Sequence, residues 1–178
     1  RVVALAAVLA AAVAAPFAAP VAPRAGAQEA TPAACPATTE DENRAVVQRW
    51  YDLIDAGDVA GFADVFSPVV IQHAADFADA RGIEEIQVSF GPFLAAFPDM
   101  AHDVQQVAAD GDLVAARVVA TGTHQGEFMG IVPTGREVTW TALAIFRIEC
   151  GRIAEHWSEV DSVGRLVQLG AIPPLGSS

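Results

Sequence analysis

The 178-residue chain contains no lysine and only two cysteines, and its 22 acidic residues outnumber its 10 basic ones. Without lysine, the protein cannot form a Schiff base with a carbonyl substrate. The formal net charge of −12 argues against nucleic acid or an anionic membrane surface as a partner, because both require a positive footprint. The sequence also lacks metal-ligand motifs and a Gly-x-Gly-x-x-Gly motif, so we expect no metal and no cofactor. The function classes that remain are acid/base catalysis and a protein without catalytic activity.

An uncharged run of Ala, Val, Leu and Pro follows Arg1 and extends to Pro23. With the small residues at 25–27, this run predicts a signal peptide over residues 1–27, cleaved before Gln28. A retained membrane anchor is the alternative, and it is disfavoured because the run is mostly alanine and contains prolines. We therefore expect a secreted or extracytoplasmic protein that has no membrane contact after cleavage.

The two cysteines are Cys35 and Cys150. In an exported protein, two cysteines more often form one disulfide than remain two free thiols. Two unpaired thiols are the alternative, because Cys35 lies in a segment rich in Pro, Ala and Thr that has little to bury.

Composition and hydrophobic periodicity divide the rest of the chain into a linker over residues 28–39, one domain over 40–172 and a flexible tail over 173–178. Apolar residues at three- and four-residue spacing predict helices beginning at 41–42 and running over 59–66 and 83–97, with a brief strand at 69–71 between the last two.

Beyond residue 100 the hydrophobic period changes to two, and Asp110-Gly111 and Cys150-Gly151 mark turns. This pattern predicts long strands that pair antiparallel in a meander, over residues 102–108, 113–123, 137–149 and 152–160. Helices followed by a curved antiparallel sheet indicate the α+β class.

Several stretches in the second half are distinctive: GTHQGEFMGI at residues 122–131, PTG at 133–135, IFRI at 145–148, GRI at 151–153, and Trp157, Asp161 and QLG at 168–170. Together they resemble the SnoaL-like polyketide cyclase (ester cyclase) branch of the NTF2-like superfamily, over about residues 40–170. The resemblance implies a cone in which N-terminal helices close one side of a bent sheet around a pocket. It also implies a homodimer formed through the outer sheet face, where the strands again carry apolar residues.

In that family an aspartate after the tryptophan acts as general acid/base, and Asp161 is the matching position. Aldol ring closure needs a proton removed from carbon and delivered to an alkoxide, which a partly desolvated carboxylate can do. The other role open to Asp161 is to cap the helix that begins at Ser162, and the two roles are compatible. The alternation in the last strand does not decide which of its faces lines the pocket.

His124 and His73 match two further family histidines and are candidate catalytic groups, although a histidine near a strand end more often has a surface or structural role. His102 and His156 are expected to be more exposed. The predicted pocket-wall residues are Trp50, Phe128, Trp140 and Trp157, some of which can belong to the core instead. The residues at 126–130 form either a lid or a simple hairpin connection.

Two functions follow from these observations. The first is a cofactor-independent exported cyclase or isomerase that acts on a small apolar carbonyl compound through Asp161 and His124. The second is a secreted module that binds a small apolar molecule without turnover, in which Asp161 is only a helix cap.

Overall fold

The computed structural model describes residues 35–76, 78–174 and 176. The predicted signal peptide and most of the predicted linker lie outside these residues. The elements follow in the order α1 (Glu40–Asp55), α2 (Phe62–Val65), β1 (Phe66–Ala74), β2 (Ala80–Arg81), α3 (Ile83–Ala96), β3 (Ala101–Asp110), β4 (Leu113–Thr123), β5 (Glu137–Glu149), β6 (Arg152–Val160) and α4 (Ser162–Leu169). The α+β class predicted from the sequence is confirmed.

The strands form one six-stranded sheet in the order β2-β1-β6-β5-β4-β3. Strands β3 to β6 make the predicted antiparallel meander, and β4, β5 and β6 have the predicted bounds. The expectation of a wholly antiparallel sheet is wrong, because β1 pairs parallel to β6. A parallel pair needs a long crossover connection instead of a tight turn, so no local sequence signal marks it.

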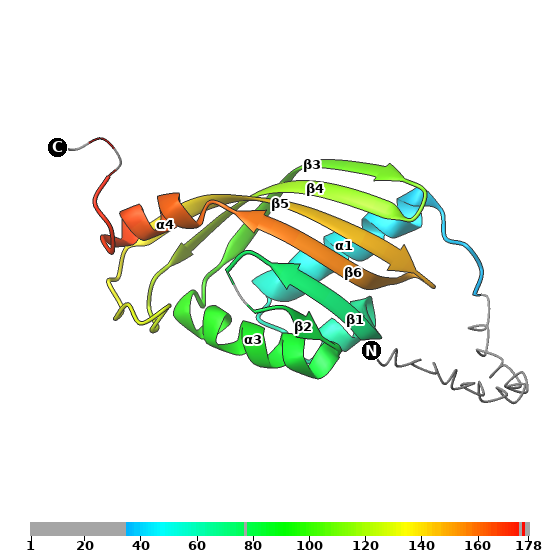
Figure 1. The fold of residues 1–178 in the computed structure, drawn as a ribbon, viewed down its shortest axis with the longest axis horizontal. Helices are drawn as coiled ribbons and strands as arrows, with labels where there is room; N and C mark the ends of the chain where they lie inside the picture. The colour runs from blue at the N-terminus through cyan, green and yellow to red at the C-terminus, as the bar shows by residue number, and fades with distance from the viewer. Residues whose placement is uncertain (1–34, 77, 175, 177–178) are drawn as a thin grey trace, which may run out of the picture. The chain divides into compact units, whose positions relative to one another are not determined.

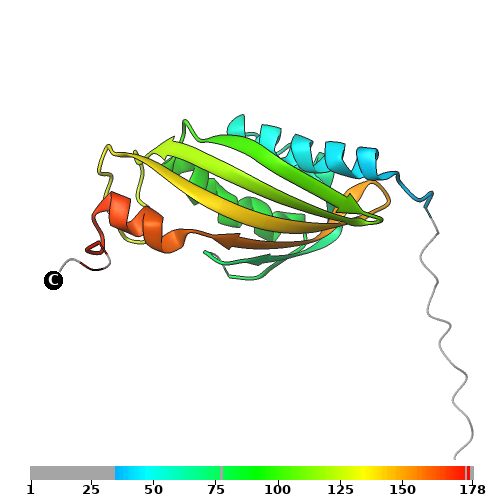
Figure 2. The ribbon, with the colours of Figure 1, turned by 90° about the horizontal axis from the view of Figure 1, so that it is seen from above.

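Helices α1 and α3 lie on the same side of the curved sheet (Figures 1 and 2). The face of the sheet that they cover carries the even-numbered residues of β4 and β5, among them Val114, Ala116, Val118, Trp140 and Phe146. Trp50 of α1 stands at the centre of the core, with its ring centroid 4.7 Å from those of Phe62 and Phe66. The buried aromatic rings supply most of the apolar area that holds the helices on the sheet.

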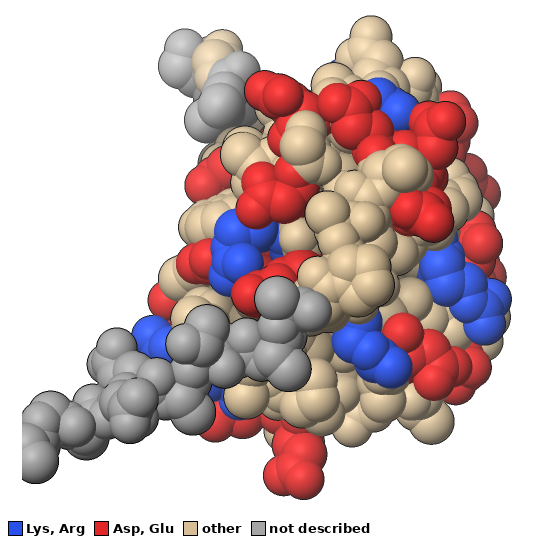
Figure 3. Space-filling model, turned by 90° about the vertical axis from the view of Figure 1, so that its right-hand side faces the viewer, with Lys and Arg blue, Asp and Glu red and all other residues tan. Residues whose placement is uncertain are grey.

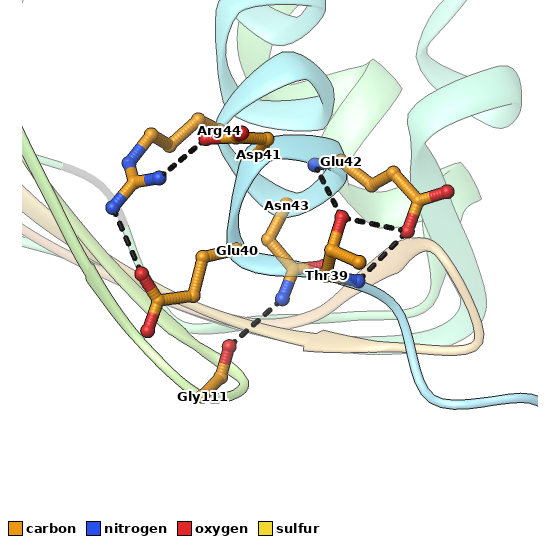
Figure 4. A network of polar contacts seen from close by, with 7 residues as sticks. All are labelled: Thr39, Glu40, Asp41, Glu42, Asn43, Arg44 and Gly111. Carbon is orange, nitrogen blue, oxygen red and sulfur yellow. Dashed lines mark hydrogen bonds and ion pairs between the residues drawn. The ribbon is translucent and has the colours of Figure 1, made fainter.

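Helix α1 begins with a capping box, shown in Figure 4. The Glu42 backbone N–H donates to Thr39 Oγ1, and the Thr39 backbone N–H donates to the Glu42 carboxylate. One residue further, the buried Asn43 donates from Nδ2 to the Gly111 carbonyl at 2.9 Å. These contacts fix the start of α1 against the β3–β4 hairpin, and the helix begins one residue before the predicted position.

Cys35 and Cys150 form the expected disulfide, with their Cα atoms 5.3 Å apart. Cys150 and Gly151 both have positive φ angles, as a two-residue hairpin turn requires. The bond joins the segment that precedes α1 to the β5–β6 turn, so the strand that carries His156 is held at its beginning.

The outer face of the sheet exposes Leu143 and Ile145, which are 60% and 47% accessible. The homodimer remains a prediction, and its interface would have to cover these two side chains.

Acidic side chains are spread over the face drawn in Figure 3, with a few arginines between them. Among the described residues, no helix is long and apolar enough to cross a membrane, and no three potential metal ligands lie close together.

Replacing both cysteines by alanine should lower the free energy of unfolding by about 2–4 kcal/mol, because the disulfide closes a long loop and restricts the unfolded chain. The two cysteines are 115 positions apart. Urea unfolding of the oxidised protein and of the double variant, followed by circular dichroism, measures the difference. Equal midpoints would contradict a stabilising disulfide.

Candidate active site

A cavity of about 80 Å³ lies between the inner face of the sheet and helices α1 and α3. Its wall is mostly apolar and includes Trp50, Phe93 and Trp140, while the small Ala142 and Ala144 leave space beside these rings. Polar side chains also line it: Tyr51, Gln72, Asp76, His102, His156, Ser158 and Arg165. An apolar cavity with a few convergent polar groups is the usual form of a small-molecule site.

Two buried charges face each other in the cavity wall. Asp76 follows β1 and Arg165 belongs to α4, and their side chains are 6% and 1% accessible. Arg165 Nη2 donates to Asp76 Oδ2, and the Ser162 hydroxyl donates to Asp76 Oδ1. A buried ion is costly unless it is paired and hydrogen-bonded, so this pair fixes α4 to the end of β1.

The Arg165 guanidinium is also surrounded by aromatic rings. Its Cζ atom lies 4.8 Å from the centroid of Phe128 and 5.0 Å from that of Trp140. A cation that lies over aromatic faces is attracted by their quadrupoles. These contacts hold the guanidinium in place, while its Nε–H donor has no hydrogen-bond partner among the described residues.

Asp76 also borders the outside of the molecule. Together with Phe93, it lines both the cavity and a surface depression of about 260 Å³, whose wall includes Phe128 and Met129. Phe128 and Met129 belong to the connection between β4 and β5. Asp76 thus lies between the cavity and this depression.

Gln72 and His156 lie side by side on the inner face, because they are register partners in the parallel pairing of β1 with β6. The His156 ring stacks on Phe146, with centroids 4.6 Å apart and planes inclined by 5°. Burial, with a smaller contribution from the nearby His73, lowers the pKa of His156 to about 3. His156 is therefore neutral at physiological pH.

A second acid/base arrangement lies beside α1. His102 Nδ1 is 2.6 Å from Asp55 Oδ1, and the His102 ring packs against Tyr51. Burial raises the pKa of Tyr51, so its hydroxyl stays protonated and can donate a hydrogen bond. A histidine oriented by a carboxylate is a common form of general base.

Asp161, the predicted acid/base, is the N-cap of α4 in this structure, and its Oδ1 accepts from the Gly164 N–H at 2.8 Å. It does not line the cavity described above, and its neighbours Arg117 and Leu143 belong to a depression on the outer side of the sheet. A side chain at Gly164 would collide with the capping carboxylate, so the local sequence suits the cap. The structure thus shows Asp161 as a helix cap, and its catalytic role stays a prediction.

His124 and His73 lie away from the cavity. His124 is buried against Phe97 and accepts at Nδ1 from the Thr134 N–H, which holds the β4–β5 connection. Burial lowers the pKa of His124. His73 lies 3.0 Å from Asp79 and stacks on Trp157 outside the cavity.

Of the predicted pocket-wall residues, Trp50 and Trp140 line the cavity. Phe128 lines the outer depression and packs on Arg165, while Trp157 lies in a third depression beside His73.

Several cavity residues were not predicted from the sequence. The expectation that His102 and His156 are exposed is wrong, because both side chains are buried or nearly so. Arg165 is four residues before the buried Leu169, so a cation on the buried stripe of α4 was the available signal. Asp76 lies in a turn without periodicity, where no local pattern distinguishes it.

A model of the SnoaL-like polyketide cyclase family matches residues 44–169. Aklanonic acid methyl ester cyclase AcmA of Streptomyces galilaeus is 28% identical over 132 residues, which cover 72% of this chain and 91% of that protein. Aklanonic acid methyl ester cyclase DnrD of Streptomyces peucetius is 28% identical over 131 residues, covering 70% and 88%.

Solved structures show the same fold. IdmH of Streptomyces antibioticus is 37% identical with a TM-score of 0.65, over 72% of this chain and 98% of that one. AclR of Streptomyces galilaeus, for which a hydroxylase activity has been suggested, is 31% identical with a TM-score of 0.69, over 78% and 87%. Similar chains therefore carry different suggested reactions, so the reaction has to be argued from the site.

The buried neutral His156 should make the protein less stable in acid. Its folded pKa of about 3 lies below the usual 6.5, so the unfolded chain binds the extra proton between these pH values. The contribution of His156 to the free energy of unfolding is fully present above pH 6.5 and is lost as the pH falls toward 3. Between pH 7 and pH 5 the loss should be about 2 kcal/mol.

Replacing His156 with Phe should remove this part of the pH dependence and leave that of the surface carboxylates. Urea unfolding of both proteins at pH 7 and pH 5 measures the difference between the two slopes. If wild type and His156→Phe lose the same free energy of unfolding, His156 is not buried in the neutral form.

Proposed function

Because the chain belongs to the SnoaL-like polyketide cyclase family, we propose that it is a cofactor-independent cyclase or isomerase that moves protons on a small, largely apolar carbonyl compound. The observation that carries the proposal is the buried Asp76 carboxylate beside the Arg165 guanidinium in the wall of an apolar cavity. A base next to a fixed positive charge is what the formation of an enolate requires.

In the proposed reaction, the Asp76 carboxylate removes a proton from the carbon next to the substrate carbonyl. The electron pair of the C–H bond forms a carbon–carbon double bond, and the π pair of the carbonyl moves to its oxygen, where Arg165 stabilises the negative charge of the enolate. For cyclisation, the enolate carbon attacks a second carbonyl carbon, and a carbon–carbon bond forms. The resulting alkoxide takes the proton back from Asp76. No other reactant is consumed, and Asp76 ends in its original state.

The surroundings of Asp76 support this role. Its two oxygens accept from Arg165 and Ser162, which hold the carboxylate in one orientation and leave lone pairs for the substrate. Preorganised groups of this kind need not reorient during the reaction. An aspartate needs only modest basicity when the enolate oxygen is itself stabilised.

The size of the cavity bears on the substrate. A cavity of about 80 Å³ holds a molecule of only a few non-hydrogen atoms. A small substrate fits this space as it stands. A larger one would need the Asp76–Arg165 side of the wall to open toward the depression beneath Phe128 and Met129, which Asp76 also lines.

Asparagine variants separate Asp76 from Asp161, the general acid/base expected from the family resemblance. Asp76→Asn should slow proton exchange at least 100-fold, which is the usual contribution of a general base. Asp161→Asn should stay within about threefold of wild type, because asparagine caps a helix as well as aspartate does. Deuterium incorporation next to the carbonyl of small ketones and β-keto esters, followed by NMR in D2O, gives the rates.

The same assay distinguishes the alternatives. Loss of exchange in Asp161→Asn alone would return the catalytic role to Asp161, and loss in His102→Gln alone would assign it to the Asp55–His102 pair. Thermal unfolding of each variant must accompany the rates, because removing one charge of a buried pair can destabilise the fold.

Binding without turnover is the second candidate function, and the ion pair itself favours it, since Asp76 already has two partners. Under this function wild type and Asp76→Asn exchange substrate protons at the rate of buffer alone, while both still bind the compounds. Exchange above the buffer rate in wild type would count against a pure binder.

We also propose that the protein is exported. The uncharged run over residues 2–23 and the Cys35–Cys150 disulfide support this, because disulfides persist in oxidising compartments. A chain recovered outside the cytoplasm should begin at Gln28 by mass spectrometry. Recovery from the cytoplasm with residues 1–27 attached would contradict export.

A further inference from the structure

Unsatisfied polar atoms are concentrated around the cavity. In the described part of the chain, five buried side-chain nitrogen and oxygen atoms lack a hydrogen-bond partner, and four of them belong to Gln72, His156 and Arg165, which all line this cavity. Leaving such an atom unpaired costs about 1–3 kcal/mol, so native proteins seldom do so without a reason. A polar molecule in the cavity would remove the cost.

Gln72 contributes two of these unpaired atoms, its Nε2 and its Oε1, and its side chain is 0% accessible. His156, its register partner on β6, is 5% accessible and has an unpaired Nδ1. The stacking on Phe146 fixes the plane of the imidazole ring. Two neighbouring strands thus present an amide donor, an amide acceptor and a ring nitrogen to the same place.

We propose that Gln72 and His156 bind the uncharged polar end of the substrate, a carbonyl group with a hydroxyl nearby, as in a β-hydroxy ketone or its enol. Gln72 Nε2 donates to one lone pair of the carbonyl oxygen, the other lone pair being left for Arg165, and Gln72 Oε1 accepts from the hydroxyl. His156 contacts the same end of the molecule through its ring edge. The inference rests on the proposed function only in taking this cavity as the substrate site, and it concerns binding, not turnover.

The chemistry of the pair selects a neutral ligand. Neither side chain carries a charge, and the surrounding wall is mostly apolar. A carboxylate buried here would lose its hydration without gaining a counter-ion, since Arg165 is already paired with Asp76. A hydroxyl and a carbonyl lose less on burial and match the donor and acceptor of the amide.

Three small molecules test whether the cavity prefers a neutral ligand that has both a carbonyl and a hydroxyl. 4-Hydroxybutan-2-one has the carbonyl and the hydroxyl, 2-pentanone has the same number of non-hydrogen atoms without the hydroxyl, and acetoacetate carries a charge. Dissociation constants from NMR titration should be about 3- to 10-fold lower for the hydroxy ketone than for 2-pentanone, because one hydrogen-bonding group is added. Acetoacetate should bind no more tightly than 2-pentanone.

Gln72→Met keeps the side-chain length and removes both polar atoms. It should abolish the preference for the hydroxy ketone, and it should raise the melting temperature of the free protein by roughly 2–5 °C, because no amide is then left unpaired. Gln105→Met, the same change at an exposed position on β3, should alter neither value.

Equal dissociation constants for the two ketones in wild type would overturn the proposal. So would an unchanged preference in Gln72→Met, or a lower melting temperature, which would mean that Gln72 is satisfied by an ordered water in a structural role. His156→Phe provides a second test and should weaken binding of the hydroxy ketone more than that of 2-pentanone. These constants do not depend on Asp76, so the binding proposal and the catalytic proposal can fail separately.

Discussion

The arrangement of the site depends on one buried ion pair, between Arg165 and Asp76. A guanidinium that is 1% accessible needs a counter-ion, and Asp76 supplies it from the turn that follows β1. The pair joins α4 to β1, which are far apart in the sequence. It also brings a carboxylate and a cation to an otherwise apolar wall, where their interaction with a substrate is stronger than in water.

Asp161 affects this pair without entering the cavity. Its carboxylate and its carbonyl both accept from the first turn of α4, and the carbonyl accepts from the Arg165 N–H at 3.1 Å. The cap therefore sets where α4 begins and which of its residues face inward. Asp161, which the family resemblance predicts to be catalytic, thus also orients the residues of α4 that contact the cavity.

The polar groups of the cavity fall into two kinds with different uses. Asp76 and Arg165 are charged and line the cavity, and Asp76 also borders the surface depression, which suits proton transfer. Gln72 and His156 are neutral and lie on the inner face of the neighbouring strands β1 and β6, which suits recognition of an uncharged group. With this separation, a substrate can bind through its neutral end while its reacting carbon faces the carboxylate.

The sequence predicted the fold well and the site only in part. The bounds of β4, β5 and β6 followed from a period of two between turn signals, and the disulfide followed from the presence of two cysteines in a chain expected to be exported. The parallel pairing of β1 with β6 carries no local signal, and it is this pairing that places Gln72 beside His156.

The inner face of β6 could not be chosen from the sequence, because both faces mix polar with apolar residues and the β5–β6 register shifts after Arg147. Asp76 comes from an irregular turn, so only tertiary structure brings it to Arg165.

The central claim is that a neutral carbonyl compound binds with its polar end at Gln72 and its reacting carbon beside Asp76. A crystal structure of the complex with 4-hydroxybutan-2-one tests it most directly. The account predicts ligand oxygens within about 3.2 Å of the Gln72 amide and the carbon next to the carbonyl facing the Asp76 carboxylate. A ligand bound outside the cavity beside Asp161, with water in the cavity, would contradict it.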